Sequence, residues 1–323
     1  MNARPIRRLV LALGATLALG AAATAPAQVP MRVILPVSAG SGVDAIVRAA
    51  QAELSKALGQ PVVIENLPGA GGITGTSAIV KAAPDGNTVA VVSNNHAVNP
   101  SVFKSLPYDS LNDITPISVI GATPFLLVVN ATKVPAKNAR ELQAFLMAKP
   151  GAYNYASSGN GTIIHLAGEM FVDAAGVDVK HVPYKGTGPQ VTDLIGGQVE
   201  MGVVSLPAVA AHVKSGALRA IGVMGKSRVA SLPDVPTMAE QGFPSVDIGG
   251  WFAVVGPAKL PPAQVKRIHD AFTAAYATPD VKAAMAKQEN VIAPTTPDAA
   301  AAFMKSEQER YAQLVKKADI KLD

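Results

Sequence analysis

The chain has 323 residues, of which 49% are hydrophobic and none is cysteine, and it carries 28 Lys and Arg against 23 Asp and Glu. The lack of cysteine excludes disulfide bonds and a lipid-modified N-terminal cysteine, so a sizeable apolar core must hold the fold. The net charge of +5 falls to +2 (25 against 23) without Arg4, Arg7 and Arg8. No cluster of basic residues follows them, and we therefore expect no nucleic-acid partner.

The first 27 residues have the pattern of a secretory signal peptide. The three arginines precede an apolar run from Leu9 to about Ala23, and the small-residue motif Ala25-Pro26-Ala27 follows it. This run is shorter than the ~20 residues that span a bilayer. We therefore expect cleavage near Ala27 and a mature chain in the periplasm.

Strands and helices alternate in the first part of the mature chain. Short apolar runs predict strands, and apolar residues spaced three and four apart predict helices. In chain order the predicted elements are a strand at 31–37, a helix at 43–58, a strand at 61–65, a helix at 72–82 and a strand at 88–93. This order implies a parallel sheet covered by helices.

The pattern continues in a second α/β unit and then returns to the first. Strands are predicted at 125–130, 154–157, 199–204, 218–223 and 250–257, and helices at 139–148, 162–174, 207–214, 262–277, 280–288 and 297–318. We expect two Rossmann-like lobes, lobe 1 from 28–124 and 249–323 and lobe 2 from 125–248, joined by two crossings. A ligand is then expected in the cleft between the lobes, outside the carboxyl ends of the strands.

Two loops with the same design each join a strand to a helix. The first is Ser38-Ala39-Gly40-Ser41-Gly42-Val43-Asp44, and the second is Ser157-Ser158-Gly159-Asn160-Gly161-Thr162. Small residues let a ligand approach the backbone, and a helix N-terminus offers unpaired N–H groups and the positive end of a dipole. With the hydroxyls of Ser and Thr, such loops can hold a carboxylate without Arg or Lys. The alternative is that they only form turns and caps, with Asp44 and Thr162 as N-cap-type residues.

Signatures of catalysis and of metal binding are missing from the sequence. There is no G-x-S-x-G motif, the glycine-rich segment 69–75 lacks the third glycine of a dinucleotide fingerprint, and 225–227 lacks the first glycine of a P-loop. The histidines have no spacing typical of a zinc site, so we expect neither a metal nor a cofactor. A secreted hydrolase with Ser158 and His165 stays open as an alternative, although no third group is identifiable.

Several further side chains have two possible roles. We interpret His165 as a packing or cleft-lining residue, and Phe125 as either a core or a cleft residue. Trp251 is expected to pack in the core or support a hinge. Lys185 can reach an anion, whereas Arg48 lies off the apolar face of its helix and is interpreted as a solvated surface residue.

A series of motifs in one order runs through nearly all of the mature chain. They lie at 36–44, 59–66, 68–72, 84–86, 99–100, 106–109, 157–162, 181–186, 232–237 and 239–240. In these motifs the chain resembles the Bug-type receptors, the periplasmic solute-binding components of tripartite tricarboxylate transporters. The resemblance implies a type II periplasmic binding protein fold and capture of a carboxylate by the two loops, through backbone amides, hydroxyls and water. It also implies that the ligand is handed to the permease subunits of such a transporter.

The resemblance and the loops together give a predicted ligand-binding set. It consists of Ser38, Ala39, Gly40, Ser41, Gly42, Val43, Asp44, Ser93, Asn94, Ser157, Ser158, Gly159, Gly161, Thr162, His165, Tyr184 and Ser205. Ser41 and Val43 depart from the glycine and threonine common in the family, which favours a less polar ligand. We expect a small aliphatic dicarboxylate or an aromatic carboxylate, and a monomeric protein. A sensor subunit that presents the same ligand to a signalling receptor is the alternative.

Overall fold

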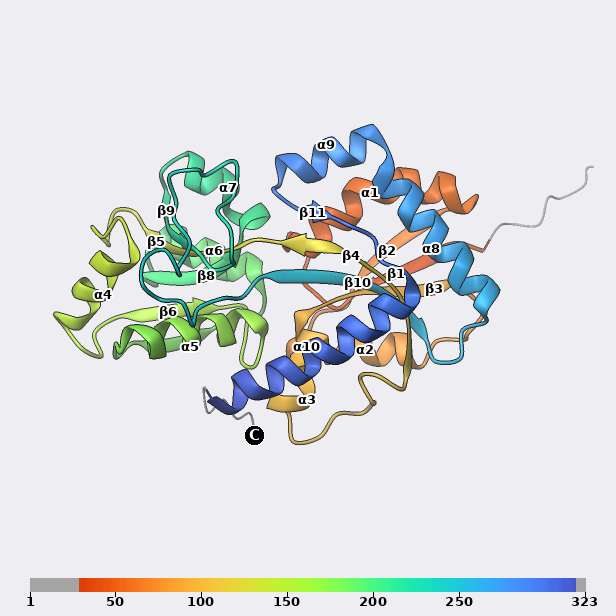
Figure 1. Ribbon diagram of the computed structural model, residues 1–323, viewed down its shortest axis with the longest axis horizontal. Coiled ribbons are helices and arrows are strands. Elements are labelled where there is room, and N and C mark those ends of the chain that lie inside the picture. The colour runs from red at the N-terminus through yellow and green to blue at the C-terminus, as the bar shows by residue number, and fades with distance from the viewer. Residues whose placement is uncertain (1–28, 318–323) are drawn as a thin grey trace, which may run out of the picture.

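A computed structural model describes residues 29–317 and has two α/β lobes side by side (Figure 1). Lobe 1 is built on a six-stranded sheet of order β11-β4-β10-β3-β1-β2, and lobe 2 on a five-stranded sheet of order β7-β6-β8-β5-β9. The predicted two-lobed α/β architecture is confirmed. The predicted signal peptide lies outside the described residues. Within residues 29–317, none of the helices has the length and apolarity needed to span a bilayer.

Lobe 1 begins as the sequence predicts, with parallel strands linked by helices. Its first elements are β1 (Met31–Leu35), α1 (Gly42–Leu58), β2 (Val62–Asn66), the 3-10 turn η2 (Ala70–Gly72), α2 (Ile73–Val80), β3 (Thr88–Ser93), α3 (Asn94–Val102) and β4 (Ile114–Thr123). Strand β1 pairs in parallel with both β2 and β3. The predicted parallel arrangement of these three strands is therefore correct.

Lobe 2 contains the middle of the chain. Its elements are β5 (Phe125–Asn130), α4 (Ala139–Met147), β6 (Asn154–Ser157), α5 (Ile163–Ala175), β7 (Lys180–Pro183), α6 (Thr187–Gly196), β8 (Met201–Ser205), α7 (Leu206–Lys214) and β9 (Leu218–Val223). Strand β6 pairs in parallel with β7 and β8, whereas β5 is antiparallel to β8 and β9. The carboxyl ends of β6 and β8 therefore point to the same edge, where α5 and α7 begin.

The chain then returns to lobe 1. The returning elements are β10 (Gly250–Pro257), α8 (Pro262–Ala277), α9 (Pro279–Lys287), β11 (Val291–Ile292) and α10 (Pro297–Lys317). Strand β10 lies antiparallel between β3 and β4, so the outgoing and returning crossings run side by side (Figure 1). Only Pro124 separates β4 from β5 at the outgoing crossing.

The apolar residues of β1 explain how lobe 1 is layered. Met31, Val33 and Leu35 are buried in one cluster with residues of α1, α8 and α9, while Ile34 is buried on the opposite face with residues of α2, α3 and α10. A strand buried on both faces reads as a continuous apolar run, which is the pattern in the sequence. The cluster that contains Ile34 continues through the crossings into lobe 2, while separate clusters cover the opposite faces of the two sheets.

Several elements differ from the prediction or escape it. The helix expected at 72–82 begins as η2, where Gly69, Gly71 and Gly72 have positive φ, and its α-helical part is shorter. The elements α3, β4, α6, β7 and β11 have no clear periodicity in the sequence. A proline lies inside α3 and another inside β4, and β7 and β11 are short. Their local patterns therefore resemble those of loops.

Candidate functional site

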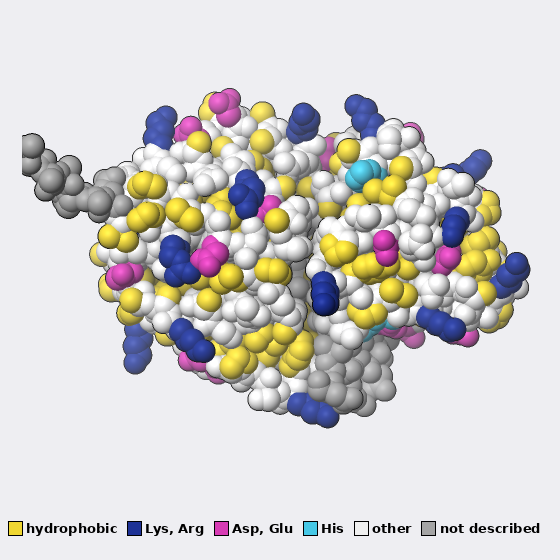
Figure 2. Space-filling model, turned by 180° about the vertical axis from the view of Figure 1, so that it is seen from behind, with side chains coloured by type: hydrophobic (Ala, Val, Ile, Leu, Met, Phe, Trp, Pro, Cys, Tyr) yellow, Lys and Arg dark blue, Asp and Glu magenta, His cyan; other side chains and the backbone are white. Residues whose placement is uncertain are grey.

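The strand ends of both lobes face a cleft with two connected compartments. The inner compartment has a volume of about 80 Å³ and the outer one about 920 Å³. Both are lined by Val37, Ser41, Asn95, Ser158 and Thr187. The two predicted loops therefore meet where the compartments join. Figure 2 shows Lys and Arg side chains scattered over both lobes on the rear face, without a basic patch.

The first loop is held in place by a reciprocal cap at the start of α1. Ser41 is the N-cap residue, and its hydroxyl accepts a hydrogen bond from the N–H of Asp44 (3.3 Å). The Asp44 carboxylate accepts one from the N–H of Gly40 (3.0 Å) and also binds Arg48 (2.9 Å) and Asn66 (3.0 Å). This arrangement is a variant of the capping box. Asp44 is therefore the third helical residue rather than the cap, and Arg48 forms an ion pair rather than being only solvated.

The second loop repeats this design at the start of α5. Thr162 is the N-cap residue, as predicted, and its hydroxyl accepts from the N–H of His165 (3.2 Å). Nδ1 of His165 accepts from the N–H of Gly161 (3.1 Å), so His165 takes the position that Asp44 takes in the first loop.

A cluster of aromatic and titratable side chains supports the second loop from behind. The ring of His165 stacks on that of His181 with centroids 3.9 Å apart, and Nε2 of His181 lies 2.6 Å from Oγ of Ser157. Ser157 in turn accepts from the N–H of Gly159 (3.1 Å). Burial lowers the pKa of His181 to about 4, with a further contribution from His165.

Glu169 and Tyr155 close the same cluster. The hydrogen bond with His165 is the main cause that lowers the pKa of Glu169, which also accepts from the hydroxyl of Tyr155. Burial and this bond raise the pKa of Tyr155. The cluster is therefore uncharged around His181 and carries its negative charge on Glu169, away from the loop.

Hydrogen-bond donors from several helices converge on the cleft. The N–H groups of Gly42 and Val43 have no acceptor among the described residues, and both residues line the inner compartment. Helix α6 also begins here, at Thr187, and Gly186 before it provides no side-chain cap. Ser93 and Ser205 precede α3 and α7, and neither hydroxyl caps its helix. The cleft is thus lined by helix N-termini with unpaired N–H groups and by hydroxyls that do not cap a helix, and both kinds of group can bind an anion.

The two lobes touch across the cleft. A Cβ atom on Gly42 would lie 2.9 Å from Oγ of Ser205, and one on Gly186 would lie 2.6 Å from Oγ of Ser38. Oδ1 of Asn95 in lobe 1 accepts a hydrogen bond from the N–H of Ile163 in lobe 2 (2.8 Å). In this arrangement of the lobes, a Cβ atom at Gly42 or Gly186 would require the facing serine side chain to shift.

The predicted ligand-binding residues fall into two groups. Those lining the cleft are Ser38, Ser41, Gly42, Val43, Ser93, Asn94, Ser158, Gly159, Thr162, Tyr184 and Ser205. Those that do not line it are Ala39 and Gly40, which are exposed to solvent, and Asp44, Ser157, Gly161 and His165, which are buried behind the lining. Four of the second group, Gly40, Asp44, Gly161 and His165, form the two caps, so of the two roles expected for His165 the structure shows packing rather than lining of the cleft.

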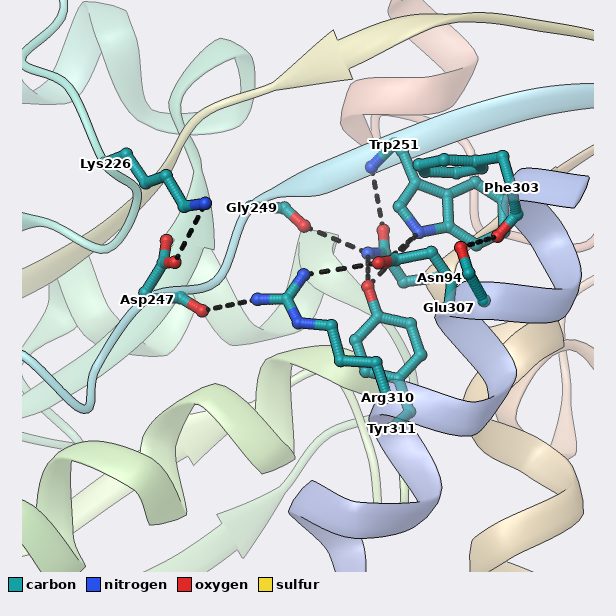
Figure 3. A network of polar contacts seen from close by, with 10 residues as sticks. Asn94, Lys226, Asp247, Gly249, Trp251, Phe303, Glu307, Arg310 and Tyr311 are labelled. Carbon is teal, nitrogen blue, oxygen red and sulfur yellow. Dashed lines mark hydrogen bonds and ion pairs between the residues drawn. The ribbon is translucent and has the colours of Figure 1, made fainter. Parts of the chain in front are cut away.

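The polar atoms of Asn94 are fully used by the second crossing (Figure 3). Its Nδ2 donates to the carbonyl of Gly249 (2.9 Å) and to the hydroxyl of Tyr311 (2.6 Å), and its Oδ1 accepts from the N–H of Trp251 (2.9 Å). The indole N–H of Trp251 donates to Glu307 (3.0 Å). Asn94 therefore faces the inner compartment but serves to fix the crossing, and Trp251 packs in the core beside it, which is one of its two expected roles.

Several lining residues were outside the predicted set. They include Asn95, Thr123, Phe125, Ile163, Ile164, Lys185, Thr187, Gln190 and Trp251. Lys185 is the one charged side chain among the described lining residues. A group of His, Asp and Glu able to hold a metal ion is absent from residues 29–317.

The hydrolase alternative has no support in the geometry. The hydroxyl of Ser158 lies 3.3 Å from that of Thr162, and Nδ1 of His165 is bonded to the backbone of Gly161. Ser157, which does contact a histidine, is completely buried and cannot meet a substrate. Neither serine therefore forms the exposed, activated nucleophile that acyl transfer needs.

Comparisons with known proteins agree with this reading of the fold. The chain is 36% identical to Protein BugT of Bordetella pertussis over 93% of its own length and 92% of that protein. The structure of the periplasmic binding protein BugD matches with a TM-score of 0.87 and 30% identity, covering 91% of this chain and 99% of BugD. BugD is named as a periplasmic binding protein rather than an enzyme, and the type II periplasmic binding protein fold is confirmed.

Two matching structures contain a bound dicarboxylate. Rpa4515 of R. palustris with adipate has a TM-score of 0.87 and 29% identity, covering 91% of this chain and 98% of its own. MatC from Rhodopseudomonas palustris with bound malate has a TM-score of 0.83 and 28% identity, covering 88% and 98%. The family model described as the tripartite tricarboxylate transporter family receptor matches residues 46–320. The chain therefore belongs to the receptors of the tripartite tricarboxylate transporter family.

Proposed function

We propose that this protein binds a small carboxylate in the cleft between its lobes and delivers it to the membrane components of a tripartite tricarboxylate transporter. The observation that carries the proposal is the convergence of unpaired donors on one place. The N–H groups of Gly42 and Val43 belong to the lining of the inner compartment, and Ser41 and Thr187, whose hydroxyl hydrogens have no acceptor among the described residues, line both compartments. Several donors around two oxygens are what a carboxylate requires.

The electrostatics of the junction favour an anion without a basic side chain in contact with it. The positive ends of α1, α5 and α6 point toward the cleft, and each contributes a favourable field over the first helical turn. The negative charge of Asp44 is offset by Arg48, 2.9 Å away. A second carboxylate on the same ligand is best accommodated in the outer compartment, which Lys185 lines.

A bound ligand that contacts both sides of the cleft holds the lobes closed. The ligand stabilises the closed form only if it contacts both lobes, and the proposed site draws on α1 from lobe 1 and on α5 and α6 from lobe 2. The two crossings, at Thr123–Phe125 and near Gly249, are the proposed hinges, with the lobes divided as 28–124 and 249–323 against 125–248. Export to the periplasm with cleavage near Ala27 places this cycle next to the permease.

The bound ligands of two relatives support the ligand class. MatC holds malate and Rpa4515 holds adipate. Both are aliphatic dicarboxylates, which is the first of the two ligand classes predicted here. An aromatic carboxylate is the second class, and the outer compartment of about 920 Å³ has room for its ring.

Thermal unfolding of residues 28–323 against a panel of carboxylates tests the proposal. The panel contains C4–C6 dicarboxylates, citrate, acidic amino acids and aromatic mono- and dicarboxylates. A ligand at ~1,000 times its Kd adds about 4 kcal/mol to the free energy of unfolding, and each kcal/mol raises Tm by about 2–4 °C. The proposal predicts such a shift with one structural class. It fails if protein that is free of co-purified ligand shows no shift with any carboxylate.

A further inference from the structure

The inner compartment contains polar atoms that the protein itself leaves unpaired. Oε1 of Gln190 and Oγ1 of Thr123 are buried and have no hydrogen-bond partner, and both residues line this compartment. Gln190 is completely buried and Thr123 is 6% exposed. A buried polar atom without a partner destabilises the fold unless a ligand or water satisfies it.

The orientation of Gln190 is fixed by its surroundings. Its Nε2 donates to the carbonyls of Ala156 (3.1 Å) and Val203 (2.8 Å), on the neighbouring strands β6 and β8. Because both amide hydrogens are used, the oxygen of this side chain is the atom left over. That oxygen can only accept, so its missing partner must be a hydrogen-bond donor.

Thr123 and two serines complete a polar group on the same walls. Thr123 lies at the end of β4, immediately before the outgoing crossing, and Ser93 and Ser205 end β3 and β8. The hydroxyls of both serines are free of their helix caps. These hydroxyls can donate or accept, which allows one partner to bind Gln190 and a hydroxyl at the same time.

The size and charge of the compartment restrict that partner. Its volume of about 80 Å³ admits a small substituent rather than a second carboxylate with its carbon chain. None of its described lining residues is charged, and Val43, Phe125, Ile163, Ile164, Val204 and Trp251 form the remaining walls. The N-terminal ends of α1 and α5 adjoin the compartment, and their positive dipole ends disfavour an ammonium group there, whereas a hydroxyl is neutral.

The compartment also lies next to the proposed carboxylate position. Ser41, Gly42, Val43 and Ser158, which belong to the two carboxylate loops, line it as well. A substituent that enters it must therefore be attached close to the carboxylate. The following inference rests on the proposed function. We propose that the inner compartment is a subsite for a hydroxyl group next to the bound carboxylate and that Gln190 and Thr123 form hydrogen bonds with this hydroxyl. The receptor therefore favours hydroxycarboxylates.

Three C4 dicarboxylates test the subsite directly. Succinate, malate and aspartate carry hydrogen, hydroxyl and ammonium at the same carbon, so their affinities, measured by calorimetry at one pH, isolate the substituent. We expect malate to bind about tenfold more tightly than succinate, as for one hydrogen bond to a buried acceptor. Aspartate should gain nothing over succinate. Equal affinities for malate and succinate, or a preference for aspartate, overturn the subsite.

Substitutions assign the preference to these side chains. In Thr123→Val, which keeps the shape of the side chain, and in Gln190→Met, the ratio of malate to succinate affinity should fall toward one. The ratio of the two affinities is the quantity to compare, because an effect on closure or on the carboxylate position changes both affinities alike. Thr123→Val remains informative if Gln190→Met, which also loses two bonds to the sheet, does not fold. An unchanged ratio in Thr123→Val and in folded Gln190→Met overturns the assignment.

The proposed function and the subsite fail in different ways. Equal binding of succinate and malate leaves carboxylate capture intact and removes only the subsite. If none of the three acids binds, the subsite is rejected. The wider carboxylate panel then decides separately whether the protein is a carboxylate receptor.

Discussion

Oδ1 of Asn95 accepts a hydrogen bond of 2.8 Å from the backbone N–H of Ile163 and so joins the start of α3 in lobe 1 to the start of α5 in lobe 2. Both residues line the inner compartment. The N–H groups of the first turn of α5 have no partner within the helix, and this bond provides one of them with an acceptor from the opposite lobe. Because the bond joins the two lobes, a separation of the lobes would break it, and the bond therefore favours the arrangement seen here.

Asn95→Ala removes this bond and leaves the N–H of Ile163 unpaired. We expect ligand affinity to fall about fivefold to tenfold, mainly through faster dissociation, because one buried hydrogen bond of the closed form is lost. Stopped-flow measurement of dissociation checks this. Asn87→Ala, in the turn before β3 and away from the cleft, is the matched control. Equal dissociation rates in the two variants contradict a role of Asn95 in closure.

Gly42→Ala tests how closely the first loop approaches lobe 2. The added Cβ lies 2.9 Å from Oγ of Ser205 in the closed arrangement, so the lobes cannot close without a local shift. We expect weaker ligand binding with little change in thermal stability, since the open form is not affected. Ser205→Ala in the same chain removes the clashing atom and should restore part of the affinity. A double variant no better than Gly42→Ala shows that another contact limits closure.

The cap at His165 predicts a difference between two substitutions at one position. His165→Gln keeps an acceptor for the N–H of Gly161, as glutamine does in a capping box, whereas His165→Leu removes it. We expect near-normal affinity for the glutamine variant and about tenfold weaker binding for the leucine variant at neutral pH. Calorimetry with the ligand identified by the carboxylate panel measures both. Equal affinities indicate that His165 contributes only packing.

Tyr311→Phe tests the network that fixes the second crossing. The hydroxyl of Tyr311 accepts from Nδ2 of Asn94 (2.6 Å) and from the indole N–H of Trp251 (3.2 Å). Its loss should lower the free energy of unfolding by about 1–3 kcal/mol, because buried donors lose a partner. Tyr276→Phe, which loses a single bond of 3.3 Å to Ile46, is the control and should cost less. Chemical denaturation of both variants gives the comparison.

His96 predicts that stability decreases in acid. Burial lowers its pKa from the usual 6.5 to about 4, although a bond to the carbonyl of Ser110 partly opposes this. Between these values the unfolded chain binds a proton that the folded chain does not, so the free energy of unfolding falls as pH decreases from 6.5 toward 4. The loss from this residue is about 2 kcal/mol at pH 5.

Denaturant unfolding at pH 7.5 and pH 5 measures this dependence. His96→Gln keeps a donor for the carbonyl of Ser110 but cannot titrate, so its stability should change less between the two conditions. The pKa of His181 is lowered in the same direction, so part of the pH dependence of stability remains in His96→Gln. An identical pH dependence in wild type and His96→Gln contradicts the assignment to His96.

The sequence was most informative where structure is determined locally. The two loops were recognised because each follows a buried strand and precedes an amphipathic helix, and these periodicities depend on residues only a few positions away. The alternative interpretation of the first loop takes Asp44 as an N-cap-type residue, whereas the cap of α1 is Ser41. The spacing of a serine and an acidic residue three positions later is the signature of a capping box. That signal was present in the sequence and could have corrected the assignment.

The rest of the site depends on contacts between distant segments. Asn95, Thr123 and Gln190 belong to α3, β4 and α6, whose patterns are obscured by prolines or glycines. Asn94 meets its partners in Gly249 and Tyr311, more than 150 residues away in the chain. Neither propensity nor spacing specifies such pairings. Only the folded structure shows which lining residues have polar atoms without a hydrogen-bond partner.

Trp251 has a consequence for how this receptor can be studied. It is the only tryptophan in the chain, it lines the inner compartment, and its indole N–H is bonded to Glu307 at the base of the crossing. The emission of an indole depends on the polarity and the hydrogen bonds around the ring. Occupancy of the cleft and movement of the crossing therefore act on the same fluorophore, and the protein carries its own optical reporter of ligand capture.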